Sequence, residues 1–348
     1  MLIAIPYLFL WTRFFLPVRR KSESIRSEVN EKLKDKQNER LRCIIFFSTF
    51  TSILISTTQS APCQNYIDLI KLNYNYTSLN AFNNSDIKTS IAEIDLEATL
   101  PIVINERVTF VTGLYGETFR VKLDVDDLSK NFYSISPKLG VNITHGEKWS
   151  GTYMLLPKLA SDFEKISSED FQMGGFVLMK YNHKPNLNYK FGVYANSEFF
   201  GPWIVPLFGL YYLSNSKKFE ANLTLPFSAD ANYQLNTKTK IGINFTGITK
   251  SYRINEPVIL DKPGYLARAT TELFGYVSFN LTRNILVQAK GGRSLGRYYR
   301  VYDEDDQIKL GIPLLFLGDN RTQLNSDFTD GWVFQVMAIY RLQLDPEQ

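Results

Sequence analysis

The sequence has 348 residues, 14% of them aromatic, and a formal net charge of +4. The excess positive charge lies in residues 1–63, and the rest of the chain has 29 basic and 30 acidic side chains. A near-neutral body excludes a general nucleic-acid binder, which needs a basic surface. Both cysteines, Cys43 and Cys63, also lie in the first segment, so the body has no disulfide and no thiol site.

Residues 1–63 are predicted to be an N-terminal extension with a signal peptide. A charged segment, Arg19 to Arg42, precedes an apolar core at residues 43–56 and then a stretch of small or polar residues. A basic flank, a short apolar core and small residues at the exit are typical of secretory signal peptides. A membrane anchor is the alternative, but the core is shorter than the about 20 residues of a membrane-spanning helix. We therefore expect an exported protein whose mature domain is residues 64–348.

The body, residues 66–344, is predicted to be a succession of strands. Between Ile91 and Leu100, apolar side chains alternate with acidic or polar ones, and a period of two indicates a strand with one apolar face. No ten-residue window of the body has a convincing helical period. After a first strand that ends before residue 77, strands are expected at 91–100, 108–119, 131–144, 149–157, 171–181, 187–199, 203–213, 219–227, 231–235, 239–252, 265–281, 285–302 and 332–344.

The segment 201–230 helps to decide whether the strands belong to a membrane barrel or to a soluble sheet. Its apolar run, Trp203–Leu213, is too short for a membrane-spanning helix and contains Pro206, which disrupts helices. After the polar turn 214–217 the chain alternates, with apolar residues at the odd positions from Phe219. Strands of about 9–11 residues can cross a bilayer when tilted in a barrel. Soluble β-sandwiches show the same alternation, so the lengths of the loops are needed to distinguish a sandwich from a barrel.

Short turns such as Asn105–Arg107 and Thr282–Asn284 alternate with longer polar loops. The longer loops are expected at residues 77–90, 117–130, 159–170, 255–263 and 303–330. Short periplasmic turns and long outer loops are typical of outer-membrane barrels. The predicted fold is all-β, a closed up-and-down antiparallel transmembrane β-barrel of about 14 strands, or about 12 if the segment around Pro226 does not form two strands.

The last predicted strand, 332–344, alternates apolar side chains with Gln335, Arg341 and Gln343. It resembles the terminal signal that outer-membrane proteins present to the barrel-insertion machinery. That signal usually ends on an aromatic residue, whereas this strand ends on Leu344. The predicted location is the cell outer membrane, with its lipid and the insertion machinery as partners and no nucleic acid.

A resemblance to a known family is carried by three segments, "WSGTYMLLPKLASDF" (149–163), "FGPWIVPLFGLYYLSNSKKFEANLTLP" (200–226) and "YRVYDEDD" (299–306). In these segments the chain is similar to the Gram-negative outer-membrane β-barrel family that has only a domain-of-unknown-function label. The resemblance covers roughly residues 64–344. It implies a porin-like fold in the outer membrane, and it supplies no catalytic or ligand residues.

Candidates for catalysis and metal binding are few. His145 and His183 are the only histidines, and both are expected in short turns. A metal site needs several ligands at a recognisable spacing, and a membrane-embedded hydrolase needs a serine near a histidine on one strand face. Neither pattern is present. We therefore expect a protein that is not an enzyme, with no catalytic residues, no metal and no cofactor.

Charged side chains on the polar faces of the strands are the first candidate site. If the apolar faces contact lipid, an acidic ladder on one early strand faces the lumen, beside basic residues of the first and the late strands. The predicted lumen-lining charges are Lys71, Glu93, Asp95, Glu97, Lys240, Arg268, Lys290 and Arg341. Opposed charges across a narrow pore favour small polar or zwitterionic solutes. In the alternative, the charges pair with one another and fill the lumen as a plug.

The second candidate is a basic and aromatic patch in the segment 292–307, at the outer end of a long strand. Its members are Arg293, Arg297, Tyr298, Tyr299, Arg300 and Tyr302, followed by the acidic run Asp303–Asp306. Aromatic rings stack on sugars and arginine pairs with lipid phosphates, so the patch can contact a ligand. In the alternative, the arginines pair with the acids and the loop closes the barrel mouth. The acidic run also has the oxygen ligands that Ca²⁺ uses, without a recognisable spacing.

The leading hypothesis for function is an outer-membrane β-barrel with a structural role or a role in passive transport of small solutes. The alternative is a non-enzymatic surface-binding barrel whose long outer loops contact a glycan, a lipid or a protein. The two differ in whether the lumen or the loops carry the function.

Overall fold

The computed structural model of the protein describes residues 66–344, with gaps at 84–87, 124–128, 256–262, 314 and 328. The predicted N-terminal extension and signal peptide, residues 1–63, lie outside the described residues together with both cysteines. No helix of the described residues is long and apolar enough to cross a membrane.

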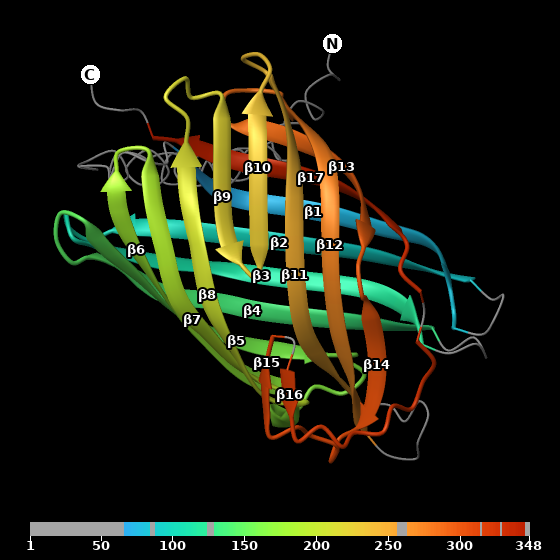
Figure 1. Cartoon of the computed structure of the whole chain (residues 1–348). Helices are drawn as coiled ribbons and strands as arrows, with labels where there is room; N and C mark the ends of the chain where they lie inside the picture. The colour runs from blue at the N-terminus through green and yellow to red at the C-terminus, as the bar shows by residue number, and fades with distance from the viewer. Residues whose placement is uncertain are drawn as a thin grey trace, which may run out of the picture. The chain divides into compact units, whose positions relative to one another are not determined.

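Fourteen strands of the described part form a closed antiparallel ring (Figure 1). The ring closes because the first strand pairs with the last as well as with the second. The strands of the ring are β1 (Tyr66–Ala81), β2 (Lys88–Val103), β3 (Val108–Lys122), β4 (Ser129–Thr144), β5 (Trp149–Ser161), β6 (Phe171–Lys184), β7 (Leu187–Glu198), β8 (Gly201–Leu213), β9 (Phe219–Leu225), β10 (Ser228–Gln234), β11 (Thr239–Ile254), β12 (Gly264–Asn280), β13 (Ile285–Ser294) and β17 (Trp332–Gln343).

The strand count settles the choice between 14 and 12. The segment around Pro226 does form two short strands, β9 and β10, which pair with each other and with β8 and β11. The expected strand 285–302 is interrupted at 295–297, where Gly296 has a φ of +66° in the left-handed region that suits glycine. Beyond the break, β14 (Tyr298–Asp303) continues along the same neighbour, β12.

Three further elements lie in the connections between strands of the ring. They are a single 3-10 turn, η1 (Ser168–Asp170), and a small hairpin made of β15 (Leu310–Ile312) and β16 (Leu315–Leu317). The hairpin contacts the wall at β8, where Gly311 lies opposite Trp203 in a parallel pair.

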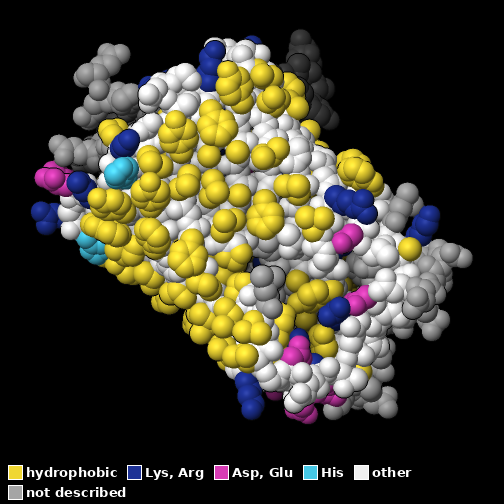
Figure 2. Space-filling view, in the orientation of Figure 1, with side chains coloured by type: hydrophobic (Ala, Val, Ile, Leu, Met, Phe, Trp, Pro, Cys, Tyr) yellow, Lys and Arg dark blue, Asp and Glu magenta, His cyan; other side chains and the backbone are white. Residues whose placement is uncertain are grey.

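The two faces of the wall differ as the alternation predicts. On β2, the outward Ile94 and Leu96 are 47% and 44% exposed, whereas the inward Glu93 and Asp95 are buried. Figure 2 shows hydrophobic side chains covering one side of the barrel, with charged side chains gathered near its margins. An apolar outer surface suits hydrocarbon and a polar inner surface suits a lumen, which is the pattern of a membrane barrel.

The short turns lie at one end of the barrel, called the turn end here, at residues 104–107, 145–148, 185–186, 214–218, 235–238 and 281–284. The longer connections lie at the opposite end, the loop end. Two expected loops, 77–90 and 117–130, are shorter than predicted because β1 runs to Ala81 and β3 to Lys122. The inward side chain of Phe119 is buried at the loop end of the interior, and this burial stabilises the end of β3 as part of the wall.

The wall is incomplete beside β9 and β10, which have only seven residues each. On this side β8 is paired with β9 from Phe208, and β11 is paired with β10 up to Thr246 and with β5 at Arg253. We call the boundary between residues 201–207 of β8 and 247–254 of β11 the seam. In Figure 1 the β15–β16 hairpin lies between β8 and β11 beyond the ends of β9 and β10.

Candidate functional site

The predicted lumen charges lie on the inner side of the wall, where each contacts a polar side chain of another strand. Lys71 pairs with Glu97, Arg341 with Asp68, and Lys240 with Glu220. Asp95 accepts a hydrogen bond from Asn73, and Lys290 donates one to Asn244. The remaining two, Glu93 and Arg268, pair with each other.

The Glu93–Arg268 pair crosses the barrel interior, because β2 and β12 are not neighbours in the ring. Arg268 donates from Nη2 to Oε2 of Glu93 over 2.6 Å and from Nη1 to Oε1 over 3.1 Å. Its guanidinium also lies 4.7 Å from the ring centre of Phe119 and 5.4 Å from that of Tyr299. A two-pronged, nearly solvent-free pair of this kind fixes the distance between two sides of the wall.

A second bridge joins β3 to β11. Lys250 Nζ lies 2.8 Å from both carboxylate oxygens of Glu117, and Tyr252 donates to the same carboxylate over 2.7 Å. Tyr115 donates to Glu117 over 2.8 Å from the same strand. Three side chains therefore make four hydrogen bonds to one buried carboxylate, and its lone pairs are satisfied in the way that a buried charge requires.

A third bridge lies nearer the turn end. Tyr66 of β1 donates to Glu220 of β9 over 2.7 Å, and Tyr211 donates to the same carboxylate over 3.1 Å. Lys240 of β11 completes the cluster at 3.2 Å. Arg341 lies over the ring of Tyr66 at 3.6 Å. These three clusters thus tie the interior across through side chains of strands that are not neighbours in the ring.

Several interior charges were missed by the sequence analysis, namely Asp68, Glu117, Lys138, Lys158, Glu198, Glu220 and Lys250. Most lie at polar positions between apolar neighbours of a strand, as Lys138 does between Pro137 and Leu139. Alternation alone could have found these. Glu117 was missed because its position was expected to lie in a loop.

Not every lysine of the described interior is paired with a carboxylate. Lys190 donates to the amide of Asn222 and the hydroxyl of Thr224, and Lys290 is bound by Asn244. Within the described residues, neither lysine has a carboxylate at ion-pair distance. Lys190 also lies directly opposite Lys180 in the β6–β7 register, and like charges placed opposite each other repel. The turn half of the interior therefore offers cationic groups that a solute anion can use.

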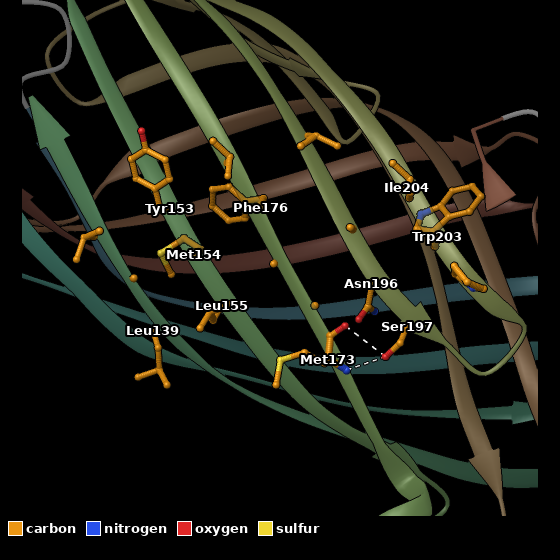
Figure 3. Close-up of a pocket in the computed structure, with 18 residues that line it drawn as sticks. Leu139, Tyr153, Met154, Leu155, Met173, Phe176, Asn196, Ser197, Trp203 and Ile204 are labelled. Carbon is orange, nitrogen blue, oxygen red and sulfur yellow. Dashed lines mark hydrogen bonds between the residues drawn. The ribbon is translucent and has the colours of Figure 1, made fainter. Parts of the chain in front are cut away.

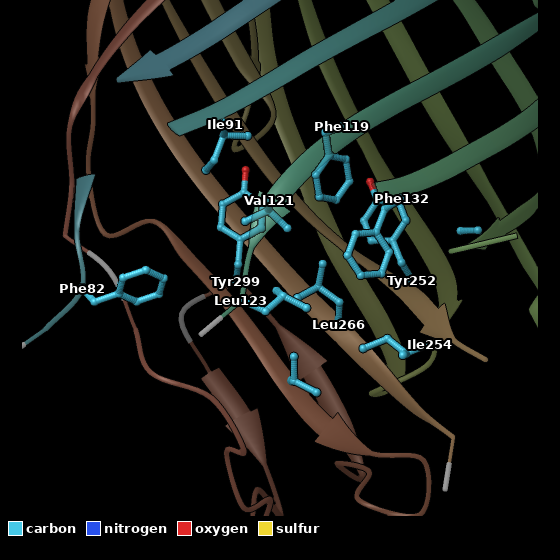
Figure 4. Packing of buried hydrophobic residues seen from close by; sticks show 12 residues of the cluster. Phe82, Ile91, Phe119, Val121, Leu123, Phe132, Tyr252, Ile254, Leu266 and Tyr299 are labelled. Atoms are coloured by element: carbon cyan, nitrogen blue, oxygen red, sulfur yellow. The ribbon is translucent and has the colours of Figure 1, made fainter. Parts of the chain in front are cut away.

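An apolar cluster closes the loop end of the interior (Figure 4). Phe119 stacks on Phe132 with ring centres 5.4 Å apart, and Tyr252 meets Phe119 edge-on at 5.0 Å. Leu266 and Val121 are fully buried in the same cluster. Its members come from β2 to β5 and the residues just after β1 and β3 on one side, and from β11, β12 and β14 on the other. We call it the mouth cluster. Its full membership is Phe82, Ile91, Phe119, Val121, Leu123, Phe132, Ala160, Tyr252, Ile254, Leu266, Tyr299 and Val301.

The predicted outer patch does not form one exposed surface. Tyr299 belongs to the mouth cluster and Tyr302 is also buried, while Arg297 is buried and donates to Asn80 and to the carbonyl oxygen of Thr329. Tyr299 faces the interior, because it lies opposite the inward Arg268 in the β12–β14 register. Tyr302 lies opposite Tyr265 on the other face of β14, where it is buried in a second apolar cluster.

The other patch residues are dispersed. Arg300 pairs with Asp327 at 2.7 Å and lies over the ring of Tyr298 at 4.7 Å, and Arg293 is exposed. The alternative of an internally paired loop is closer to this geometry, although the partner of Arg300 is Asp327 and not the predicted acidic run 303–306.

A shallow groove of about 800 Å³ lies on the outward side of β4 to β8 (Figure 3). Its walls are mostly apolar, with Leu155, Met173 and Ile204 among the exposed side chains and the small Ala195 between them. The Ser197 hydroxyl donates to the carbonyl oxygen of Met173 and accepts from the Met173 N–H. It therefore needs no hydrogen bond from a ligand. The groove suits lipid chains and not a polar solute.

The histidines lie at the turn end. His145 is in the turn between β4 and β5, with Nε2 at 2.9 Å from Tyr153 Oη, and His183 is near the end of β6. No group of three or more metal-ligand side chains occurs in the part of the chain that the structure describes.

The family model for a domain of unknown function (DUF6268) matches residues 70–306. The chain belongs to this family. The match covers thirteen of the fourteen strands of the ring, β1 to β13, together with β14, and the closing strand β17 lies beyond it. No curated protein matches the chain.

Solved structures of outer-membrane channels have a similar but distant fold. A NanC porin is 10% identical, covering 78% of this chain and all of the porin, with a TM-score of 0.32. The COG4313 outer membrane channel from Pseudomonas putida F1 is 9% identical, covering 82% of this chain and 99% of its own, with a TM-score of 0.38. A Pseudomonas aeruginosa FadL homologue is 10% identical, covering 79% of this chain and 90% of its own, with a TM-score of 0.32. At these scores the similarity carries no argument about solute or mechanism.

Proposed function

We propose that the barrel is a passive route for small polar solutes across the outer membrane, and that its interior bridges hold it closed at rest. The observation that carries this proposal is the polar filling of the interior. Replacing buried ion pairs by apolar side chains is often neutral or stabilising, so a purely structural barrel has no need of them. At the loop end the same barrel does use apolar filling, in the mouth cluster.

The solutes that fit best are small and carry a carboxylate or a phosphate. Lys190 and Lys290 are held by amide and hydroxyl oxygens, which a stronger acceptor can displace. Asp230, whose carboxylate accepts only from neutral Tyr276 and Asn232 in the contacts of the described interior, would attract an ammonium group. A zwitterion therefore finds partners for both of its charges.

Conductance in planar bilayers and swelling of liposomes test the proposal. We expect low conductance for the natural protein and a clear increase when Glu93→Gln and Glu117→Gln remove two bridges together. Asp95→Asn is the matched control: Asp95 also faces inward, but its hydrogen-bond partner, Asn73, is on the adjacent strand β1. If the double variant neither conducts nor admits amino acids into liposomes, the barrel is not a passive route. If the natural protein already conducts as well as the double variant, the bridges do not close it.

A further inference from the structure

The inner face of the wall between β10 and β1 has more hydrogen-bond acceptors than donors. The strands of this part follow one another as β10, β11, β12, β13, β17 and β1 (Figure 1). One row of paired positions crosses all of them, through Asn232, Gly242, Tyr276, Lys290, Gln335 and Asn75. Because Asn232, Tyr276 and Lys290 are buried, the row faces the interior and not the lipid.

The carboxamide oxygens of this row have no donor. Within the described residues, Oδ1 of Asn75, Oδ1 of Asn232 and Oε1 of Gln335 are buried without a hydrogen bond. Asn232 is 8% exposed, and its Nδ2 donates to Asp230 over 3.0 Å, which fixes the direction of its oxygen. Asn75 and Gln335 lie opposite each other, and the last torsion of such a side chain is soft, so either oxygen can turn toward the lumen. Buried acceptors without donors are costly, so this row offers oxygens that a ligand can satisfy.

Two carboxylates beside the row have no cation at ion-pair distance in the described interior. Asp230 accepts from Tyr276 Oη over 2.9 Å and from Asn232 Nδ2, and both bonds go to Oδ1, which leaves Oδ2 without a donor. Glu272 points inward, opposite Ser294 in the β12–β13 register, and its carboxylate accepts no hydrogen bond from a described residue. Asp230 and Glu272 are only partly buried, so a solute in the lumen can reach them.

One cation lies among these acceptors. Lys290 Nζ donates to Oδ1 of Asn244 over 3.3 Å, and it lies 5.8 Å from the ring centres of both Phe274 and Tyr276. A single long bond to a neutral amide is a weak contact for an ammonium group, and a carboxylate is a better acceptor. Lys290 is therefore the anion-binding group of this part of the wall.

The charges around Lys290 favour a ligand with more positive than negative groups. Asp230, Glu272 and Asp95 act electrostatically on its ammonium from beyond ion-pair distance. Asp95 already accepts a hydrogen bond from a β1 amide, and Lys71 belongs to another ion pair. One ammonium and two carboxylates therefore remain for a ligand, with the amide oxygens of the row beside them.

We propose that this part of the lumen binds diamino acids, solutes with one carboxylate and two ammonium groups such as lysine. The carboxylate binds Lys290, the two ammonium groups bind Asp230 and Glu272, and the amide oxygens of the row accept the remaining N–H donors. The charges of the ligand thus match those of the wall one for one. A metal dication suits the wall less, because no three metal-ligand side chains of the described residues converge. The inference rests on the proposed function and names a solute class for its route.

The binding of three matched solutes to the purified barrel tests the inference. Lysine has both ammonium groups, norleucine lacks the second, and cadaverine lacks the carboxylate. In titration calorimetry, lysine should bind about tenfold more tightly than either analogue, because each analogue loses one charge-assisted contact. Equal affinities for lysine and one of the analogues, or no binding of lysine, would overturn the inference.

A charge-neutralising variant identifies the residue that reads the second ammonium group. Glu272→Gln should lower the affinity for lysine about tenfold, to the level of norleucine. The variant should fold, since the Glu272 carboxylate has no partner to lose within the described residues, and heat-modifiable migration on a gel verifies this. The matched control Glu147→Gln removes the same charge from an exposed turn and should leave the affinity unchanged. Equal losses in the two variants would mean a general charge effect and no diamino-acid site.

Transport is measured separately, so that the site and the route can fail independently. Liposomes that contain the Glu93→Gln, Glu117→Gln barrel should swell faster in lysine than in norleucine. Preferential binding of lysine without any swelling would refute the passive route and support the site. Equal swelling in both solutes, together with equal affinities, would refute the site and support the route.

Discussion

The ion pair between Glu93 and Arg268 allows the sharpest test of how the interior is held together. Both side chains are buried, with 8% and 3% of their surfaces exposed. Arg268→Met would leave the Glu93 carboxylate in the interior without its cation, and removing one partner of a buried pair typically costs about 3–5 kcal/mol. Loss of the contacts with the Phe119 and Tyr299 rings adds about 1 kcal/mol.

Removing both partners should cost much less. Glu93→Leu together with Arg268→Met replaces the pair by apolar side chains of similar volume, a change that is often neutral. We therefore expect the double variant to lie within about 1–2 kcal/mol of the natural protein. Since each single variant should lose about 3 kcal/mol or more, the two single losses and the double loss give a coupling energy of at least about 4 kcal/mol.

Urea unfolding from lipid vesicles, followed by tryptophan fluorescence, measures all four states of this cycle. Planar-bilayer conductance on the same proteins shows whether the pair also closes the lumen. Single variants that lose less than about 1 kcal/mol would refute the reasoning. So would a double variant whose loss equals the sum of the single losses, since the two side chains would then not be coupled.

Three further predictions concern the outer face, the mouth and the loops. Leu96→Arg should destabilise the barrel by about 2–4 kcal/mol in vesicle unfolding, because an outward cation at mid-height meets hydrocarbon; a loss below about 0.5 kcal/mol would mean that this face is not in lipid. Phe119→Ala removes a fully buried ring from the mouth cluster, so it should cost about 3–5 kcal/mol and increase conductance, and unchanged conductance would show that the cluster is not a barrier. Burial by itself raises the pKa of Asp330, but backbone N–H donors from Arg297 and Gly296 outweigh it and hold that pKa below its usual value. Its contribution to stability should be complete above pH about 4, the unfolded pKa, and should be lost as the pH falls through the lower folded pKa, whereas Asp330→Asn should be less stable at neutral pH and less sensitive to acid.

Much of the fold could be predicted from the chain because alternation is local. A residue such as Glu93 between two apolar neighbours has its direction set by the pleat, whatever the strand pairs with. This is why the lumen charges lie inside and why Leu96 lies outside. The break at Gly296 was not predicted, since the pattern of 285–302 alternates well enough to continue as one strand.

The dispersal of the outer-patch residues could not be predicted, for a different reason. Tyr299 and Tyr302 have no sequence signal that separates a loop tip from the inner face of a wall. Their burial depends on β14 remaining beside β12, with Tyr299 packed in the mouth cluster and Tyr302 packed in a second apolar cluster on the other face of β14. Arg300 likewise pairs with Asp327, a residue that comes much later in the loop.

By itself the sequence determined the strands, their two faces and the barrel class, because these depend on the order of apolar and polar residues over a few positions. Only the tertiary structure decided which charges meet across the interior, such as Glu117 with Lys250, and where the wall has a seam. Those features join side chains that are far apart in the chain. They depend on how long each neighbouring strand is and on how closely opposite walls approach, and neither quantity is encoded in any one segment.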